Sequence, residues 1–275
     1  MAIDLSRVPE YKQTYEMCLD AVKANGKQFQ YVKEAFQTEE LCCAAVQEKG
    51  KNLKYIKNQT PAICLAAIEH WGWDEDIFAY VKDQTPKICL AAVKKNGWAL
   101  KYVKEQTPEV CLAAVKEAGY AIKYVKDQTP ELCFEAVKQN GLALLYIKDQ
   151  TPEVCIAAVQ QTWRALEYVK EQTPEICLEA VKQDEFALQY VKAPTPAIYL
   201  EAVKQNGRML EHVPRSKQTL PIAIAALKQN PDSRQFLAVK FRKPEVYKAA
   251  GYDYKPEDLA PSRTRTKRER TEPSY

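Results

Sequence analysis

Residues 106–127 read Gln106-Thr-Pro-Glu-Val-Cys-Leu-Ala-Ala-Val-Lys-Glu-Ala-Gly-Tyr-Ala-Ile-Lys-Tyr-Val-Lys-Asp127, and nearly the same sequence begins again at Gln128, Gln150 and Gln172. Tandem units of this kind form one elongated domain, because each unit stacks only on its neighbours. The length therefore does not predict separate globular domains. A threonine opens each of the ten units, with most steps being 22 residues: Thr14, Thr38, Thr60, Thr85, Thr107, Thr129, Thr151, Thr173, Thr195 and Thr219.

Each unit has the pattern of two short helices. The threonine suits the N-cap of the first helix, and the proline that follows it in seven units suits the first helical turn. Apolar residues such as Val110, Cys111 and Ala114 recur at helical spacing. A glycine twelve residues after the threonine, such as Gly119, is expected to end this helix in the left-handed conformation. With a shorter second helix over 120–126, the sequence predicts an all-α fold, an α-solenoid of about ten 22-residue helix-turn-helix repeats.

Helices this short are unstable alone, so stability must come from stacking between units. We expect residues 1–13 to form an N-terminal cap and residues 14–254 to form the solenoid, with a half-repeat C-terminal cap at 243–251. Residues 255–275 are expected to be a basic disordered tail. The net charge is +4, and +3 of it lies in residues 261–275, so the rest of the chain is nearly neutral. The basic residues of this stretch are Arg263, Arg265, Lys267, Arg268 and Arg270.

Eight of the nine cysteines fall four residues after a threonine. Equivalent residues of stacked helices lie about 8–10 Å apart, which exceeds the roughly 7 Å Cα separation that a disulfide permits. No Cys-x-x-Cys pair with histidine support occurs, which argues against zinc. We therefore interpret the cysteine ladder as small core residues in a reducing compartment. Its members are Cys18, Cys42, Cys64, Cys89, Cys111, Cys133, Cys155 and Cys177.

Tyrosine and lysine recur in the second helix. The tyrosine ladder can be interpreted as stacking platforms for single-stranded nucleic acid, but a residue that every stacking interface requires would also recur, and we favour packing at the edge of the core. Acidic residues follow most of the lysines, which favours a solvated face over a phosphate-binding stripe. The tyrosines are Tyr31, Tyr55, Tyr80, Tyr102, Tyr124, Tyr146, Tyr168 and Tyr190; the lysines are Lys33, Lys57, Lys82, Lys104, Lys126, Lys148, Lys170 and Lys192.

A partner's surface is not periodic, so a recognition surface should vary between units. The most variable position lies thirteen residues after the threonine, and tryptophan, tyrosine and arginine, which dominate binding hot spots, are common there. Alternatively, these residues only fill the corner beside the glycine. Including the insertion between 70 and 77, the candidate partner-binding residues are Trp71, Trp73, Trp98, Tyr120, Leu142, Arg164, Phe186 and Arg208.

The usual parts of a catalytic site are missing from the sequence. There are two histidines, no Gly-x-Gly-x-x-Gly and no phosphate-cradling Gly-Lys-Ser/Thr. We expect no enzyme, no cofactor and no metal, and we interpret His70 beside its acidic neighbours as a solvated loop. No apolar run is long enough to span a membrane, and the first residues do not form a signal peptide. The expectation is a cytoplasmic protein, or a nuclear one if the host is eukaryotic and the tail acts in targeting.

The segment Ala91-Ala-Val-Lys-Lys-Asn-Gly-Trp-Ala-Leu100 contains the most specific part of the unit. It resembles the repeats of domain of unknown function 4116, which occur in bacterial, phage and giant-virus proteins. The resemblance covers roughly residues 14–250, implies a repeat scaffold and supplies no known activity. Thr162-Trp163 and Asp184-Glu185 depart from the Asn-Gly pair, and those two junctions are expected to be bent or extended.

These observations predict a non-enzymatic scaffold that binds another protein along one face of the solenoid. One alternative is single-stranded nucleic-acid binding through the tyrosine and lysine ladders and the basic tail. Another is capture of a small anionic ligand as a viral or phage counter-defence factor, which rests on the distribution of the family alone.

Overall fold

The fold is described from a computed structural model, which describes residues 3–70 and 75–252. The chain divides into two compact units, residues 1–161 and 162–275. Every regular element of the described residues is a helix, and an α-helix alternates with a 3-10 helix along the repeats. The predicted all-α fold of stacked helical repeats is therefore confirmed.

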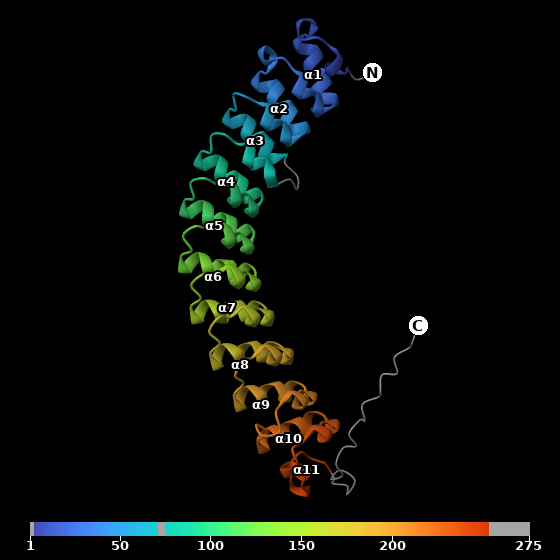
Figure 1. The fold of residues 1–275 in the computed structure, drawn as a ribbon, viewed down its shortest axis with the longest axis vertical. Coiled ribbons are helices and arrows are strands. Elements are labelled where there is room, and N and C mark those ends of the chain that lie inside the picture. Colours follow the sequence, from blue (N-terminus) through green and yellow to red (C-terminus); the bar gives the residue numbers. More distant parts are fainter. Residues whose placement is uncertain (1–2, 71–74, 253–275) are drawn as a thin grey trace, which may run out of the picture. The chain divides into compact units, whose positions relative to one another are not determined.

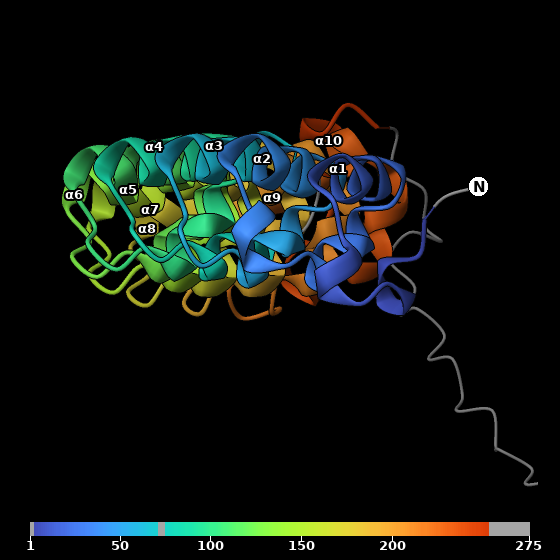
Figure 2. The same cartoon turned by 90° about the horizontal axis from the view of Figure 1, so that it is seen from above.

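In the first unit, consecutive α-helices contact one another and lie side by side in chain order (Figure 1). The 3-10 helices form a second row along the opposite side of the unit (Figure 2). The α-helices are α1 (Tyr15–Ala24), α2 (Glu39–Glu48), α3 (Pro61–Glu69), α4 (Pro86–Lys95), α5 (Pro108–Glu117), α6 (Pro130–Gln139) and α7 (Pro152–Gln161). The 3-10 helices are η1 (Leu5–Arg7), η2 (Glu10–Lys12), η3 (Gly26–Tyr31), η4 (Glu34–Phe36), η5 (Gly50–Tyr55), η6 (Glu75–Tyr80), η7 (Gly97–Tyr102), η8 (Gly119–Tyr124) and η9 (Gly141–Tyr146).

The second unit repeats this alternation. Its elements are η10 (Trp163–Tyr168), α8 (Pro174–Gln183), η11 (Glu185–Tyr190), α9 (Pro196–Gln205), η12 (Gly207–His212), α10 (Leu220–Gln229), η13 (Pro231–Phe236), η14 (Val239–Phe241) and α11 (Pro244–Ala249). Each α-helix from α8 to α11 contacts the next, so the unit is again built by stacking.

The α-helices begin as the sequence predicts. In α5, the Thr107 hydroxyl accepts a hydrogen bond from the Val110 amide at 3.3 Å, and Pro108 fills the first helical position. This cap satisfies an amide that the helix itself leaves unpaired. Val110, Cys111 and the other apolar residues of the predicted stripe are buried, as are all eight members of the cysteine ladder. The residues that recur in every repeat therefore account for both the capping and the burial of the α-helices.

The expected left-handed glycine stop is wrong. Six α-helices (α1, α2, α4, α5, α6 and α9) end at an extended residue such as Asn140 (φ −153°), and the glycine after it is the first residue of a 3-10 helix. Within the part of the chain that the structure describes, Gly251 alone has a positive φ. The physical reason for the glycine is close approach between repeats: a Cβ on Gly119 would lie 2.6 Å from the carbonyl oxygen of Ala136. The recurrent glycine therefore lets its repeat approach the backbone of the next repeat closely.

The junction at Asp184-Glu185 was expected to be bent or extended relative to the other junctions, and this is also wrong, because its backbone has the same conformation as theirs. Asp184 is extended (φ −156°), and its carboxylate accepts a hydrogen bond from the Phe186 amide at 2.8 Å. Asn140 caps η9 in the same way, through the Leu142 amide at 3.0 Å. A short polar acceptor is what this junction needs, and aspartate supplies it as well as asparagine does.

Candidate functional site

The variable strip lies on the row of 3-10 helices, with Trp98, Tyr120 and Leu142 as the second residues of η7, η8 and η9. A 3-10 helix has three residues per turn, so the residue three places later lies on the same face. The tyrosine ladder supplies the next residue. We call these nine side chains the grid: Trp98, Lys101 and Tyr102 on η7, Tyr120, Lys123 and Tyr124 on η8, and Leu142, Leu145 and Tyr146 on η9.

The rings of the grid contact one another across repeats. Trp98 is stacked with Tyr120 at a centroid distance of 6.3 Å and meets Tyr124 edge-on at 6.0 Å. Tyr120 in turn meets Tyr146 edge-on at 5.9 Å. Such offset and edge-to-face pairs are the favoured arrangements of aromatic side chains. Two ladders that the sequence analysis assigned to separate roles therefore form one aromatic cluster.

The two lysines of the grid lie over its rings. The Lys123 ammonium is 5.7 Å from the ring centroid of Tyr124 and 5.2 Å from that of Tyr146, and the Lys101 ammonium is 5.0 Å from that of Tyr102. These are cation–π distances. Lys101 also donates a hydrogen bond to the Tyr102 hydroxyl at 3.2 Å, which raises the pKa of Lys101.

One carboxylate borders the grid. The Tyr102 hydroxyl donates a hydrogen bond to Asp76, and this bond raises the pKa of Tyr102. Asp76 is exposed on η6, beside the η7 end of the grid. The grid therefore carries two positive charges, with one negative charge at its η7 end.

The grid is partly open to solvent. Trp98, Tyr120 and the three tyrosines at the helix ends are half-buried, while Leu145 is 51% exposed. Elsewhere in the tyrosine ladder, Tyr31 is 43% exposed. The predicted interpretation of the tyrosines as packing residues is therefore only part of their role, because each ring also presents surface.

In the second unit, the strip residues Arg164, Phe186 and Arg208 are exposed on η10, η11 and η12. The Arg164 guanidinium lies 4.9 Å from the ring centroid of Trp163, whose ring is 5.8 Å from that of Tyr190. Trp163 was not predicted as a site residue. The signal for it was present, because tryptophan occupies the position of the recurrent glycine.

Several predicted residues lie outside the described residues. These are Trp71 and Trp73 of the insertion, and the tail residues Arg263, Arg265, Lys267, Arg268 and Arg270.

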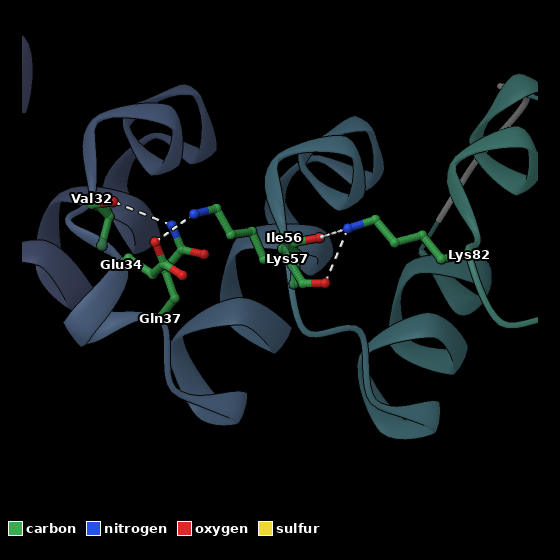
Figure 3. Close-up of polar contacts among 6 residues, drawn as sticks. All are labelled: Val32, Glu34, Gln37, Ile56, Lys57 and Lys82. Atoms are coloured by element: carbon green, nitrogen blue, oxygen red, sulfur yellow. Dashed lines mark hydrogen bonds and ion pairs between the residues drawn. The ribbon is translucent and has the colours of Figure 1, made fainter.

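The lysine ladder is exposed to solvent apart from the half-buried Lys33, and several of its ammonium groups also bond the neighbouring repeat. The Lys126 ammonium donates a hydrogen bond to the backbone carbonyl of Lys104, one repeat earlier, at 2.8 Å. Lys82 does the same to the carbonyls of Ile56 and Lys57 at 3.1 and 3.0 Å, while Lys57 forms an ion pair with Glu34 at 2.6 Å (Figure 3). These ammonium groups join successive repeats, although they remain near solvent.

A glutamine ladder, which the sequence analysis missed, fixes the ends of η3, η6, η7, η8, η9, η11 and η13. Gln106 donates a hydrogen bond to the Tyr124 carbonyl at 2.8 Å and accepts one from the Lys126 amide at 3.0 Å. It thereby satisfies two backbone groups beyond the helix end. The signal was a glutamine directly before nine of the ten threonines, with Pro194 as the exception. The same pair of bonds recurs at Gln13, Gln59, Gln84, Gln128, Gln172 and Gln218.

The side formed by the α-helices has its own hollows. A groove of about 1070 Å³ lies between α5 and α6, with Leu112 and Leu132 in its lining and Glu109 and Glu131 among its acidic residues. A second hollow of about 680 Å³ in the other unit is lined by Leu200 and by residues of α10. Residues such as Leu112 lie five places after the threonine, and their partial exposure was not predicted.

No helix of residues 3–70 and 75–252 is long and apolar enough to cross a bilayer. No three histidine, cysteine or carboxylate side chains in those residues come together as a metal site would require.

The comparison with protein families gave two tandem matches. The family described as Domain of unknown function (DUF4116) matches residues 85–129 and residues 129–173. Both matches begin at a capping threonine, so each spans two of the 22-residue repeats. This confirms the predicted resemblance over these residues. No curated protein and no solved structure matched the chain.

Proposed function

From the premise that residues 85–173 match two tandem copies of a domain of unknown function, we propose that the protein is a non-enzymatic repeat scaffold that binds another protein along its row of 3-10 helices. The single observation that carries the proposal is the grid, a partly exposed aromatic cluster built by three consecutive repeats. Tryptophan and tyrosine in such clusters supply most of the affinity at protein interfaces.

A protein partner is favoured over single-stranded nucleic acid because the faces of several rings are already covered by other side chains. Base stacking needs open ring faces, whereas Trp98 and Tyr120 stack on each other and Lys123 lies over two tyrosines. Lys126 and its equivalents would bind phosphates less well, because their ammonium groups already bond backbone carbonyls. Single-stranded nucleic acid is the alternative outcome of the test below.

The proposal includes a cytoplasmic location, a viral or phage source and the absence of enzymatic activity. Eight buried thiols suit the reducing environment of the cytoplasm. A viral or phage source would agree with the distribution of the family that the repeats resemble. The scarcity of histidine and of phosphate-binding motifs supports a binding role rather than an enzymatic one.

The proposal is tested by selecting random displayed peptides on the immobilised full-length protein. We expect enriched peptides on the wild type and their loss on the double variant Trp98→Ala/Tyr120→Ala. The matched control is Leu112→Ala/Phe134→Ala, which removes two partly exposed apolar side chains from α5 and α6 and should retain the peptides. Circular dichroism verifies that both variants are folded.

Two results would overturn the proposal. One is enrichment that survives Trp98→Ala/Tyr120→Ala unchanged. The other is an absence of enriched peptides together with retention of labelled oligodeoxythymidylate at about 50 mM salt, which would assign the surface to nucleic acid.

A further inference from the structure

We infer that the partner segment is an extended acidic peptide with two carboxylates three residues apart and an apolar residue three places beyond the second. In one-letter form this is E-x-x-E-x-x-Φ, where Φ is apolar. The inference rests on the proposed function, and it names the chemistry that the grid would recognise.

The charge argument comes from the middle row of the grid, which consists of Lys101, Lys123 and Leu145 on η7, η8 and η9. An ammonium group has three donors, and the one hydrogen bond of Lys101 goes to a tyrosine hydroxyl, which is neutral at physiological pH. The contacts of Lys123 are with ring faces. Both cations can therefore form charge-assisted hydrogen bonds to incoming carboxylates, and the exposed Leu145 favours an apolar side chain in the third place.

The spacing argument comes from the stacking of repeats. Neighbouring helices pack about 8–10 Å apart, so we expect the backbone positions of the three middle-row residues to follow one another in steps of about that length. A polyproline-II segment rises about 3.1 Å per residue and returns to the same face after three residues, or about 9.3 Å. A β-strand returns after about 6.7 Å and an α-helix turn after about 5.4 Å. In the polyproline-II conformation, every third residue of the peptide would therefore meet the next repeat of the protein.

The rings of the grid suit such a segment. Trp98 meets Tyr124 and Tyr120 meets Tyr146, so the rings form one aromatic surface beside the two lysines. Aromatic-lined surfaces are a general mode of polyproline-II peptide recognition. The two residues between successive anchors would contact these rings.

The two lysines are not equivalent. Asp76 lies beside Lys101 through its hydrogen bond to Tyr102 and opposes a carboxylate at that end. Lys123, at the centre of the grid, has no acid among its described contacts. We therefore expect substitution of Lys123 to weaken binding more than substitution of Lys101.

The test is fluorescence anisotropy of labelled peptides on the full-length protein. The peptide Glu-Pro-Pro-Glu-Pro-Pro-Leu carries the inferred spacing, and Glu-Pro-Pro-Pro-Glu-Pro-Leu has the same composition with the wrong spacing. We expect the first to bind about tenfold more tightly, and Lys123→Glu to remove about tenfold of its affinity. Lys87→Glu, at the opposite end of the repeat on α4, is the matched control and should leave the affinity unchanged.

A charge exchange sharpens the result. The peptide Glu-Pro-Pro-Lys-Pro-Pro-Leu should bind Lys123→Glu more tightly than it binds the wild type. Equal affinity for the two spacings, or no response to Lys123→Glu, overturns this inference; the proposed function then still stands if displayed peptides of other sequences require Trp98 and Tyr120. If labelled oligodeoxythymidylate binds more tightly than either peptide and is released by Lys123→Glu, both are overturned.

Discussion

At the scale of the residue, the cysteine ladder shows what burial does to a reactive group. The side chain of Cys64 is buried in α3, and desolvation, with a smaller contribution from the Asp83 carboxylate, raises the pKa of its thiol to about 11. Burial likewise raises the pKa of Cys42 to about 11. The fold therefore favours the neutral thiol, because a thiolate would lose its hydration.

The raised pKa predicts a loss of stability at alkaline pH. An unfolded thiol ionises near pH 8.5, so the preference of the fold for the neutral form is fully present below that pH and is lost as pH rises toward 11. We expect the difference in free energy of unfolding between the wild type and Cys64→Ala to narrow over this range. Guanidinium unfolding at about pH 7, 9 and 10.5 measures it.

The control for this prediction is Leu65→Ala, which removes apolar surface beside Cys64 without removing an ionisable group. Its difference from the wild type should stay constant with pH. A pH-independent difference for Cys64→Ala as well would contradict the prediction.

At the scale of the element, each 3-10 helix is held by its neighbours rather than by its own propensity. Gln106 holds the end of η8 through the Tyr124 carbonyl. At the other end of η8, the amide of Gly119 donates a hydrogen bond to Gln139 of the next repeat at 2.9 Å. Six residues form too short a helix to be stable alone, so these side-chain bonds decide that the segment is ordered.

The close contact at the start of η8 predicts the effect of a single methyl group. In Gly119→Ala, the new Cβ would meet the Ala136 carbonyl oxygen, which is backbone and cannot turn aside. We expect the free energy of unfolding to fall by about 1–3 kcal/mol, measured by urea unfolding.

The matched control for Gly119→Ala is Glu185→Ala, because Glu185 occupies the equivalent position and the repeat already accommodates its Cβ. This control loses the hydrogen bond that Asn206 donates to Glu185 at 3.1 Å and should therefore lower the free energy of unfolding by about 1 kcal/mol at most. Equal stability of Gly119→Ala and the wild type would mean that the repeats can separate at no cost.

The sequence predicted the α-helices better than the 3-10 helices. Thr107-Pro108 marks the start of α5 because capping chemistry is local, and the buried stripe follows from a period of 3.6 over ten residues. The 3-10 geometry of η8 was not predictable, since six residues do not distinguish a period of 3.0 from 3.6. The glycine was misinterpreted because its constraint comes from Ala136, a residue of another repeat.

The candidate site was predictable only in part, for the same reason. Variation at one position identified Trp98, Tyr120 and Leu142, but not that Tyr124, Tyr146 and Lys123 would join them. Those contacts depend on the path of the backbone between repeats, which no local pattern encodes. The glutamine ladder was visible as a recurrent letter, yet its two backbone partners lie 18 and 20 residues further on.

At the scale of the whole molecule, each of the two compact units is built by contacts that link one repeat to the next, as in other one-dimensional repeat arrays. Deletion of residues 107–128 joins Gln106 to Thr129 and restores the Gln-Thr-Pro sequence at the junction. We expect the shortened chain to fold, with the denaturant m-value lowered by roughly a tenth because about one repeat in ten is no longer exposed on unfolding.

The control for this deletion removes half a repeat, residues 107–117, and leaves η8 without its α-helix. It should abolish cooperative unfolding. If the full-repeat deletion also abolished cooperative unfolding, the repeats would not be independent structural units.

The hydrogen bonds between repeats have a consequence for how the protein is made. The side-chain bonds of Gln106 and Lys126 reach partners 18 to 22 residues away, however long the chain is. Contact order is therefore low, a property of fast-folding proteins. A ribosome adds about 5–20 residues per second, so each repeat meets its predecessor within a few seconds of synthesis. The nascent chain can fold one repeat at a time as it leaves the exit tunnel, with little unpaired apolar surface exposed at any moment.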